Sequence, residues 1–209
     1  VLRLQPEPLR QIRGHKVAMI FQEPMTALNP LHRVEKMIGE TLLLQGWSKK
    51  KTQARVIELL KDVGIPEPQD KLRRYPHELS GGQRQRVMIA MALALDPDIL
   101  IADEPTTALD VTLQAQILEL LKSLQRSRNM AIILISHDLN LVHRYADQVV
   151  VMKQGKIEEQ GKVHDIFTAP KQAYTRNLLN HDFGEAIQIA EQSNLLTLHQ
   201  VGVKFPIKE

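Results

Sequence analysis

Two continuous apolar runs separated by one amphipathic segment constrain the fold of this chain more than any other feature. Residues Ile99 to Ala102 and Ala131 to Ile135 are apolar without alternation, a pattern typical of strands buried on both faces of a parallel sheet. Residues 112–126 lie between them and carry apolar side chains at helical spacing: Leu113, Ile117, Leu120, Leu121 and Leu124. The sequence therefore predicts a strand–helix–strand crossover with both strands central in the sheet.

Polar residues follow each of these strands. Asp103 and Glu104 come directly after the first strand, and Ser136, His137 and Asp138 come after the second. Because the carboxyl ends of parallel strands align, these residues are expected at one edge of the sheet, where open α/β sheets bind ligands. An Asp-Glu pair at a buried strand end suits a Mg²⁺ ligand beside a general base. Taken alone, the pair is explained equally well as a solvated strand end.

The first half of the chain predicts another strand and then a helical section. Lys16 to Phe21 is a short apolar run that ends at Gln22, so this strand presents an amide at its carboxyl end. Residues 34–46 and 50–63 have helical periodicity, and a further helix rich in Ala and Met runs from Ser80 to Leu95. The middle of the chain is therefore expected to be all-helical.

The C-terminal part predicts a hairpin and then helices. Val149–Met152 and Lys156–Gln160 flank the dipeptide Gln154-Gly155, which is typical of a two-residue hairpin turn and places this hairpin at the margin of the sheet. Residues 164–192 are mostly helical in pattern. Residues 195–205 instead indicate two short strands, as expected at the start of another domain.

The start of the helix at Ser80 has an unusual composition. Ser80 and Gln83 fit a capping box, in which each side chain accepts from a backbone amide at the helix start. Gly81 and Gly82 are not needed for the cap, but they let backbone amides approach another group closely, and the helix dipole there favours an anion. The segment predicts phosphate contact, with a well-capped helix as the simpler alternative.

Composition excludes several classes of function. The chain has no cysteine, which rules out disulfides and thiolate metal sites. The longest apolar run, Val87 to Leu95, is about half the length that a membrane-spanning helix needs. The net charge is only +3 and aromatic residues make up 4% of the chain, without interleaving with basic clusters. Direct nucleic-acid binding is therefore not expected.

Taken in order, these motifs resemble those of the ATP-binding-cassette (ABC) ATPases. Leu79–Gln83 matches the signature motif, Ile99–Thr106 the Walker B motif, Ala108–Asp110 the D-loop and Ser136–Asp138 the switch histidine, with Gln22 at the position of the Q-loop glutamine. Three further stretches are similar to the oligopeptide, dipeptide and nickel importer subfamily: Phe21–Pro30, Tyr75–His77 and Tyr174–Leu179.

The resemblance implies a P-loop NTPase-like α/β core, in which a parallel sheet with flanking helices carries an inserted helical subdomain at about residues 23–90. It also implies an ABC ATPase domain over residues 1–165, a helical tail over residues 166–194 and the start of a second ABC domain over residues 195–209.

The resemblance further implies a role for each motif residue. Asp103 and Gln22 would hold Mg²⁺, Glu104 would polarise the attacking water, and His137 would orient that water at the γ-phosphate. Asp110 would communicate across the dimer of nucleotide-binding domains. Four signature residues would contact ATP held by the opposite domain: Ser80, Gly81, Gly82 and Gln83.

One indispensable motif of that family is absent. A P-loop reads G-x-x-x-x-G-K-[ST], and its amides and lysine hold the β- and γ-phosphates. Gly14-His15-Lys16 and Gly161-Lys162-Val163 come nearest, but each lacks a required residue. The sequence is therefore expected to be an N-terminally truncated piece that is inactive alone. Residues 195–205 resemble the opening strands of a second cassette, which implies a tandem two-cassette parent.

The resemblance implies ATP and Mg²⁺ as cofactors. It implies a second ABC ATPase domain and transmembrane permease subunits as partners, with a solute-binding protein as an indirect partner and a peripheral location on the cytoplasmic face of the bacterial inner membrane.

Two alternative functions remain. A non-transport ABC ATPase keeps the fold, although the short segment between Gln22 and Leu79 leaves no room for a long coiled-coil insertion. In the second alternative, the chain is a non-catalytic half of a tandem cassette protein, which binds the second ATPase domain but does not contribute to ATP hydrolysis.

Overall fold

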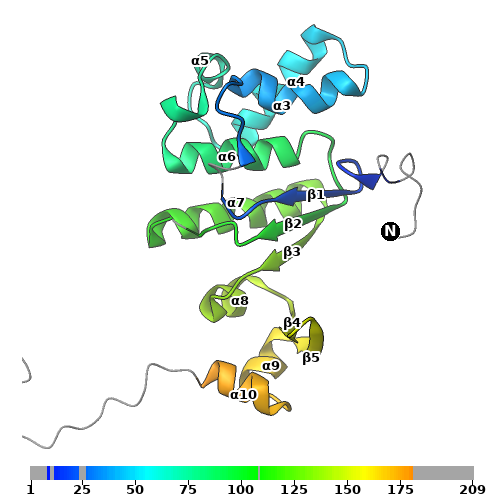
Figure 1. The fold of residues 1–209 in the computed structure, drawn as a ribbon, viewed down its shortest axis with the longest axis vertical. Helices are drawn as coiled ribbons and strands as arrows, with labels where there is room; N and C mark the ends of the chain where they lie inside the picture. The colour runs from blue at the N-terminus through cyan, green and yellow to red at the C-terminus, as the bar shows by residue number, and fades with distance from the viewer. Residues whose placement is uncertain (1–8, 10–11, 24–26, 108, 181–209) are drawn as a thin grey trace, which may run out of the picture.

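A three-stranded parallel sheet forms the centre of the protein (Figure 1). The computed structural model describes residues 9, 12–23, 27–107 and 109–180. The strands lie in the order β1 (Val17–Ile20), β2 (Ile99–Asp103) and β3 (Ala131–Ile135). Their ladders place Ile20 beside Ala102 and Ala102 beside Leu134, so the three carboxyl ends meet at one edge.

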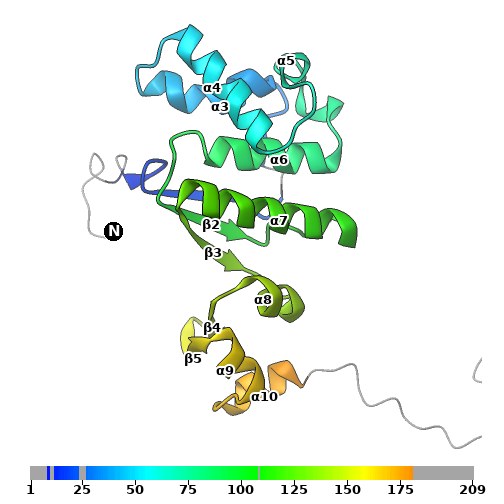
Figure 2. The same ribbon diagram turned by 180° about the vertical axis from the view of Figure 1, so that it is seen from behind.

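Helix α7 (Val111–Arg128) makes the predicted crossover from β2 to β3. The Asp110 side chain caps its start by accepting from the Leu113 amide at 3.0 Å, and Asn129 ends it in the left-handed conformation. Three of the predicted face residues are buried, Ile117, Leu121 and Leu124, and Leu118 is buried with them. Leu113 and Leu120 are half-buried. Figure 2 shows α7 lying across one face of the sheet.

A layer of helices lies alongside β1, with α6 next to the strand (Figure 1). It contains α3 (Val34–Leu44), α4 (Lys49–Asp62), the short α5 (Pro68–Lys71), a 3₁₀ turn (Pro76–Glu78) and α6 (Gly81–Ala92). The helices predicted at 34–46 and 50–63 are confirmed within two residues at each end. Helix α6 packs against α3 and α4 on one side and against β1 on the other, so it connects the two layers.

The expectation that both apolar strands are covered on both faces is wrong for β3. Strand β2 is central, but β3 lies at the edge, and Ile133 and Ile135 remain 51% and 46% exposed. Met19, in the same cross-strand row as Ile133, is 37% exposed. Alternate residues of a strand point to opposite faces, and in the described ranges no helix covers the face opposite α7 (Figure 1).

The segment after β3 begins with a helix that packs on the main core through Leu141 and Tyr145 and continues into a small hairpin and two short helices. It contains α8 (Leu139–Tyr145), β4 (Gln148–Lys153), β5 (Lys156–Lys162), α9 (Val163–Thr168) and α10 (Ala173–Leu179). The predicted hairpin is confirmed: Gln154 and Gly155 both have positive φ, as a type I′ turn requires.

The predicted position of this hairpin at the margin of the main sheet is wrong. Strands β4 and β5 form a two-stranded sheet of their own. Strand β4 pairs along its length with β5, and neither strand pairs with β1, β2 or β3. Residues 181–209, which include the strands predicted in 195–205, lie outside the described residues, as do Pro24, Met25, Thr26 and Ala108.

No helix in the described parts of the chain combines the length and the apolar character needed to span a bilayer.

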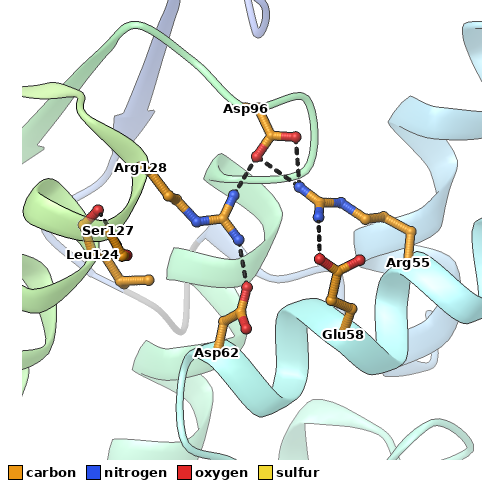
Figure 3. A network of polar contacts seen from close by, with 7 residues as sticks. All are labelled: Arg55, Glu58, Asp62, Asp96, Leu124, Ser127 and Arg128. Atoms are coloured by element: carbon orange, nitrogen blue, oxygen red, sulfur yellow. Dashed lines mark hydrogen bonds and ion pairs between the residues drawn. The ribbon is translucent and has the colours of Figure 1, made fainter.

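An ion-pair network ties the helical layer to the sheet layer (Figure 3). Asp96, in the loop before β2, accepts from Arg55 of α4 at 2.6 and 2.7 Å and also pairs with Arg128 at the end of α7. Arg128 in turn donates to Asp62 of α4 at 2.5 Å, and Arg55 donates to Glu58 at 2.8 Å. Both guanidinium groups are largely buried, with 12% and 15% of the side chain exposed.

Replacing Asp96 by Asn tests how much this network stabilises the contact between the layers. Asn tolerates the positive φ of 51° at this position, so the change removes charge without straining the backbone. We expect the free energy of unfolding to fall by about 1–2 kcal/mol, because two largely buried guanidinium groups lose an acceptor. Asp98→Asn is the control, since its pair with Lys16 is more than 60% exposed on both sides and is worth at most about 0.5 kcal/mol. Urea unfolding measures both, and equal losses would contradict the assignment.

Candidate active site

Side chains from the carboxyl ends of all three parallel strands meet at Glu104. Gln22, after β1, donates its amide Nε2 to Glu104 Oε2 at 2.9 Å. His137, after β3, places Nδ1 at 2.9 Å from the other carboxylate oxygen, Oε1. The side chain of Glu104 is 22% exposed and that of His137 is 77% exposed, so this cluster opens to solvent. The predicted alignment of the ends of β2 and β3 is therefore observed, and the end of β1 joins them at the same edge.

The backbone of Glu104 is held in an unusual conformation. Its φ is +44°, in the left-handed region that residues other than glycine seldom adopt. The Glu104 amide donates to the Ile135 carbonyl at 3.0 Å, and the Glu104 carbonyl accepts from the Thr107 amide at 3.2 Å. Such conformations persist where surrounding contacts hold them, and they are concentrated at functional sites.

Thr107 is a site residue that the sequence analysis missed. Its hydroxyl donates to Glu104 Oε2 at 2.9 Å, so the carboxylate has three side-chain partners. The sequence does contain a signal for this contact. A threonine stands three positions after Glu104 in a turn, and at that spacing a hydroxyl can form a hydrogen bond within the turn.

The two charged groups of the cluster shift each other's titration. The hydrogen bond from His137 lowers the pKa of Glu104, and the hydroxyl of Thr107 and the amide of Gln22 lower it further. The same contact with Glu104 raises the pKa of His137. Glu104 is therefore ionised at neutral pH and surrounded by donors, which suits a group that orients and polarises water.

Asp103 lies beside this cluster, at the end of β2. Its carboxylate makes no hydrogen bond or ion pair with a side chain or backbone group of another described residue. Among the described residues, no group of three or more His, Asp or Glu side chains could hold a metal ion. Mg²⁺ is commonly held by one or two carboxylates together with substrate phosphates, so a single free carboxylate fits an ion shared with a nucleotide.

The start of α6 forms the second part of the candidate site. The capping box is confirmed: Ser80 Oγ accepts from the Gln83 amide, and Gln83 Oε1 accepts from the Ser80 amide, both at 3.2 Å. Residues 80–83 and Asp110 line an open groove of about 410 Å³. The structure thus brings the predicted signature segment and D-loop residue together, although Asp110 also has the structural task of capping α7.

The two signature glycines differ in their surroundings. A Cβ atom on Gly82 would lie 2.9 Å from Leu113 Cδ1, so close packing of α6 on α7 accounts for this glycine. A Cβ atom on Gly81 would meet nothing within 4 Å. The fold does not need a glycine at position 81, and its small size leaves room for a ligand.

The structure does not bring all predicted site residues into one cluster. Gln22, Glu104 and His137 are in contact, but none of them lines the groove formed by residues 80–83 and Asp110. The chain therefore carries two separate half-sites.

Comparison with known proteins identifies relatives of the whole arrangement. A family model described as "ABC transporter" matches residues 3–107. The dimeric structure of a post-hydrolysis state of the ATP-binding cassette MJ0796, bound to ADP and Pi, superimposes with a TM-score of 0.66 at 32% sequence identity. The match covers 77% of this chain and 68% of that one.

Curated relatives are more similar in sequence. The peptidoglycan transport ATP-binding protein YejF of Agrobacterium fabrum is 58% identical over 180 residues, which cover 86% of this chain and 33% of the relative. The dipeptide transport ATP-binding protein DppD of Bacillus subtilis is 54% identical over 178 residues, which cover 85% of this chain and 53% of the relative. The chain thus spans between a third and about half of the length of these relatives.

The contact between Glu104 and His137 predicts how this histidine titrates. A raised pKa means that the protonated imidazole stabilises the folded state below its ordinary pKa of about 6.5. That contribution is lost as the pH rises through the higher folded-state pKa. Glu104 stays ionised throughout this range because its own pKa is lowered.

We expect Glu104→Gln to shift the pKa of His137 downward, measured by NMR from the imidazole Cε1 proton. Glu119→Gln is the control, because this carboxylate bonds to the Tyr145 hydroxyl and not to the cluster, and it should leave the His137 pKa unchanged. A wild-type His137 that titrates at or below 6.5 would show that the pair does not form in solution.

Proposed function

This chain belongs to the ABC transporter family, and from that premise we propose that it supplies water-activating and signature elements to an ATPase that powers uptake of peptides or peptide-like solutes. The observation that carries the proposal is the contact of Glu104 with Gln22, Thr107 and His137 at the ends of three parallel strands. Its narrower part, peptide transport, rests on relatives that are named for dipeptide and peptidoglycan transport.

In this proposal Glu104 orients and polarises the water that attacks the γ-phosphate. The carboxylate is ionised and accepts from three donors, so it has a fixed direction before substrate binds. His137 is mostly exposed and reaches the open side of the cluster, where it would hydrogen-bond the phosphate and the water. Gln22 would complete the shell and link it to the helical layer through the segment that follows.

Asp103, with Gln22, would hold a Mg²⁺ ion that the nucleotide phosphates also bind. When bound, the ion neutralises charge on the phosphates. The chain's own contribution is a carboxylate that no neighbouring described residue neutralises, placed one residue before Glu104.

The groove at the start of α6 would act on a different nucleotide. We propose that Ser80, Gly81, Gly82 and Gln83 contact ATP held by an opposing ATPase domain, and that Asp110 lies at that interface. The open space at Gly81 and the amides at the helix start favour an anionic ligand there. Separation of the two half-sites within the chain supports this division, since each would be completed from elsewhere.

The phosphate cradle of the first half-site would come from polypeptide outside this sequence. Two observations support this: the sequence contains no P-loop, and the sheet leaves an apolar face exposed at Met19, Ile133 and Ile135. We propose an ABC ATPase domain over residues 1–165 with a helical subdomain at about 23–90, a helical linker over 166–194, and the start of a second cassette over 195–209. A tandem protein of this kind agrees with the 33% coverage of the Agrobacterium relative.

Transmembrane permease subunits would be the direct partners of such a protein, with a solute-binding protein as an indirect one. The ATPase would then be peripheral, on the cytoplasmic face of the membrane. A non-catalytic role for this half of a tandem protein is the competing interpretation, and the variant of Glu104 described next separates the two.

Glu104→Gln in the full-length protein tests the catalytic assignment. The amide keeps the size of the side chain but cannot accept a proton, so we expect ATP turnover to fall about 10²- to 10⁴-fold. The control is Glu158→Gln, which changes a carboxylate on β5 away from the cluster and should retain wild-type turnover. Unchanged turnover in the Glu104 variant would instead favour the passive role.

Nucleotide binding by this chain alone tests the proposed division of the site. Without a phosphate cradle, we expect no MgATP binding in the micromolar range by isothermal titration calorimetry, whereas the full-length protein should bind in that range. Micromolar affinity of the 209-residue chain would show that its own residues suffice to hold the triphosphate.

A further inference from the structure

A buried glutamine connects the helix of the signature segment to the loop that carries Glu104. Gln85 lies in the second turn of α6, is 1% exposed, and donates its Nε2 to the carbonyl oxygen of Pro105 at 2.6 Å. Pro105 is the residue that directly follows Glu104, and it is itself buried. The contact therefore joins two segments that belong to different half-sites.

The loop at Glu104 needs such a contact because its conformation is unfavourable on its own. Glu104 has a φ of +44°, which residues other than glycine seldom adopt, and it precedes a proline, whose ring favours extended backbone in the residue before it. Three bonds from other elements hold the loop. The Glu104 amide donates to the Ile135 carbonyl, Gln85 donates to the Pro105 carbonyl, and Gln114 of α7 donates to the Thr106 carbonyl at 3.3 Å.

Among these bonds, only the one from Gln85 comes from the helix that also carries the groove residues. Helix α6 begins at the capping box of Ser80 and Gln83, so the same rigid helix presents the signature residues to the groove and Gln85 to the loop. Gln114, by comparison, lies on α7. Its bond to the Thr106 carbonyl, at 3.3 Å, is longer than the 2.6 Å bond from Gln85 to the Pro105 carbonyl. A displacement of α6 at the groove would therefore move the amide of Gln85 and, through Pro105, the backbone of Glu104.

We propose that Gln85 is a positioning residue that couples occupancy of the signature groove to the alignment of the Glu104 carboxylate. This inference rests on the proposed function and adds a connection between its two half-sites within one chain. The ligand at the groove, a nucleotide phosphate held by the opposing domain, would thereby influence the base that acts on the other nucleotide. The direct chemical role stays with Glu104, because Gln85 is buried beneath the loop.

Gln85→Met in the full-length protein tests the inference. Methionine fills the same space but cannot donate to Pro105. We expect kcat for ATP hydrolysis to fall about 10- to 100-fold, as small misplacements of a reacting group do, while KM for ATP changes less than twofold. Gln85→Leu is the second variant, because it also removes the donor without burying a charge and offers a different apolar shape if methionine disturbs folding.

Gln114→Met is the matched control, because it releases the same loop from α7 without detaching α6. We expect its kcat to stay within about threefold of wild type. If kcat of Gln114→Met falls as far as that of Gln85→Met, then any bond that holds the Glu104 loop is equally important. That result would overturn the specific coupling to α6. Thermal unfolding of both variants, with turnover measured well below the transition, separates loss of folded protein from loss of alignment.

A double-mutant cycle with Gly81→Ala supplies a measurement that a purely structural role would not affect, because a Cβ at this position enters the groove, meets nothing within 4 Å and leaves the Ser80 cap of α6 in place. If the groove acts through Gln85, the kcat losses of Gly81→Ala and Gln85→Met should combine to less than their product, whereas those of Gly81→Ala and Gln114→Met should multiply. Multiplicative losses in the first pair, or a kcat of either folded Gln85 variant within twofold of wild type, would overturn the inference. Failure of the proposed function is recognised separately, by an absence of ATP turnover in the wild type or full turnover in Glu104→Gln.

Discussion

The parallel pairing of β1, β2 and β3 is the constraint on which the candidate site depends. The ladders align Ile20 with Ala102 and Ala102 with Leu134, so whatever follows each strand emerges at the same edge. Gln22 and His137 are 82 and 33 positions from Glu104, and only this alignment brings both within 2.9 Å of its carboxylate. A slip of one residue in either ladder would turn the strand's side chains to the opposite face and separate them.

Helix α6 gives the second half-site its position and its connection to the first. Its start is fixed by the reciprocal bonds of Ser80 and Gln83, and its body packs between α3 and α4 on one side and β1 on the other. The network around Asp96 holds the helical layer against the end of α7. The two half-sites are therefore parts of one packed body, although they do not touch, and this is what allows a buried side chain such as Gln85 to link them.

The local elements were predictable because their signals are local. Helical periodicity located α3, α4 and α7 within two residues, and the dipeptide Gln154-Gly155 located the hairpin turn. Prediction failed where partners distant in sequence decide the outcome. A continuous apolar run does not reveal whether a strand is central, and Ile133 and Ile135 of β3 are exposed. A hairpin pattern likewise does not specify which sheet the hairpin joins.

The sequence by itself determined which chemical groups are present and in what order, because the motifs from Gln22 to His137 are read directly from residue types and spacing. It also determined that no P-loop is present in the chain. Only the tertiary structure decided that Glu104 has a positive φ, that Thr107 is its third partner and that Gln85 supports the loop from beneath. These features depend on bonds between segments far apart in the chain or on the exact path of a turn, and residue spacing along the chain carries no information about either.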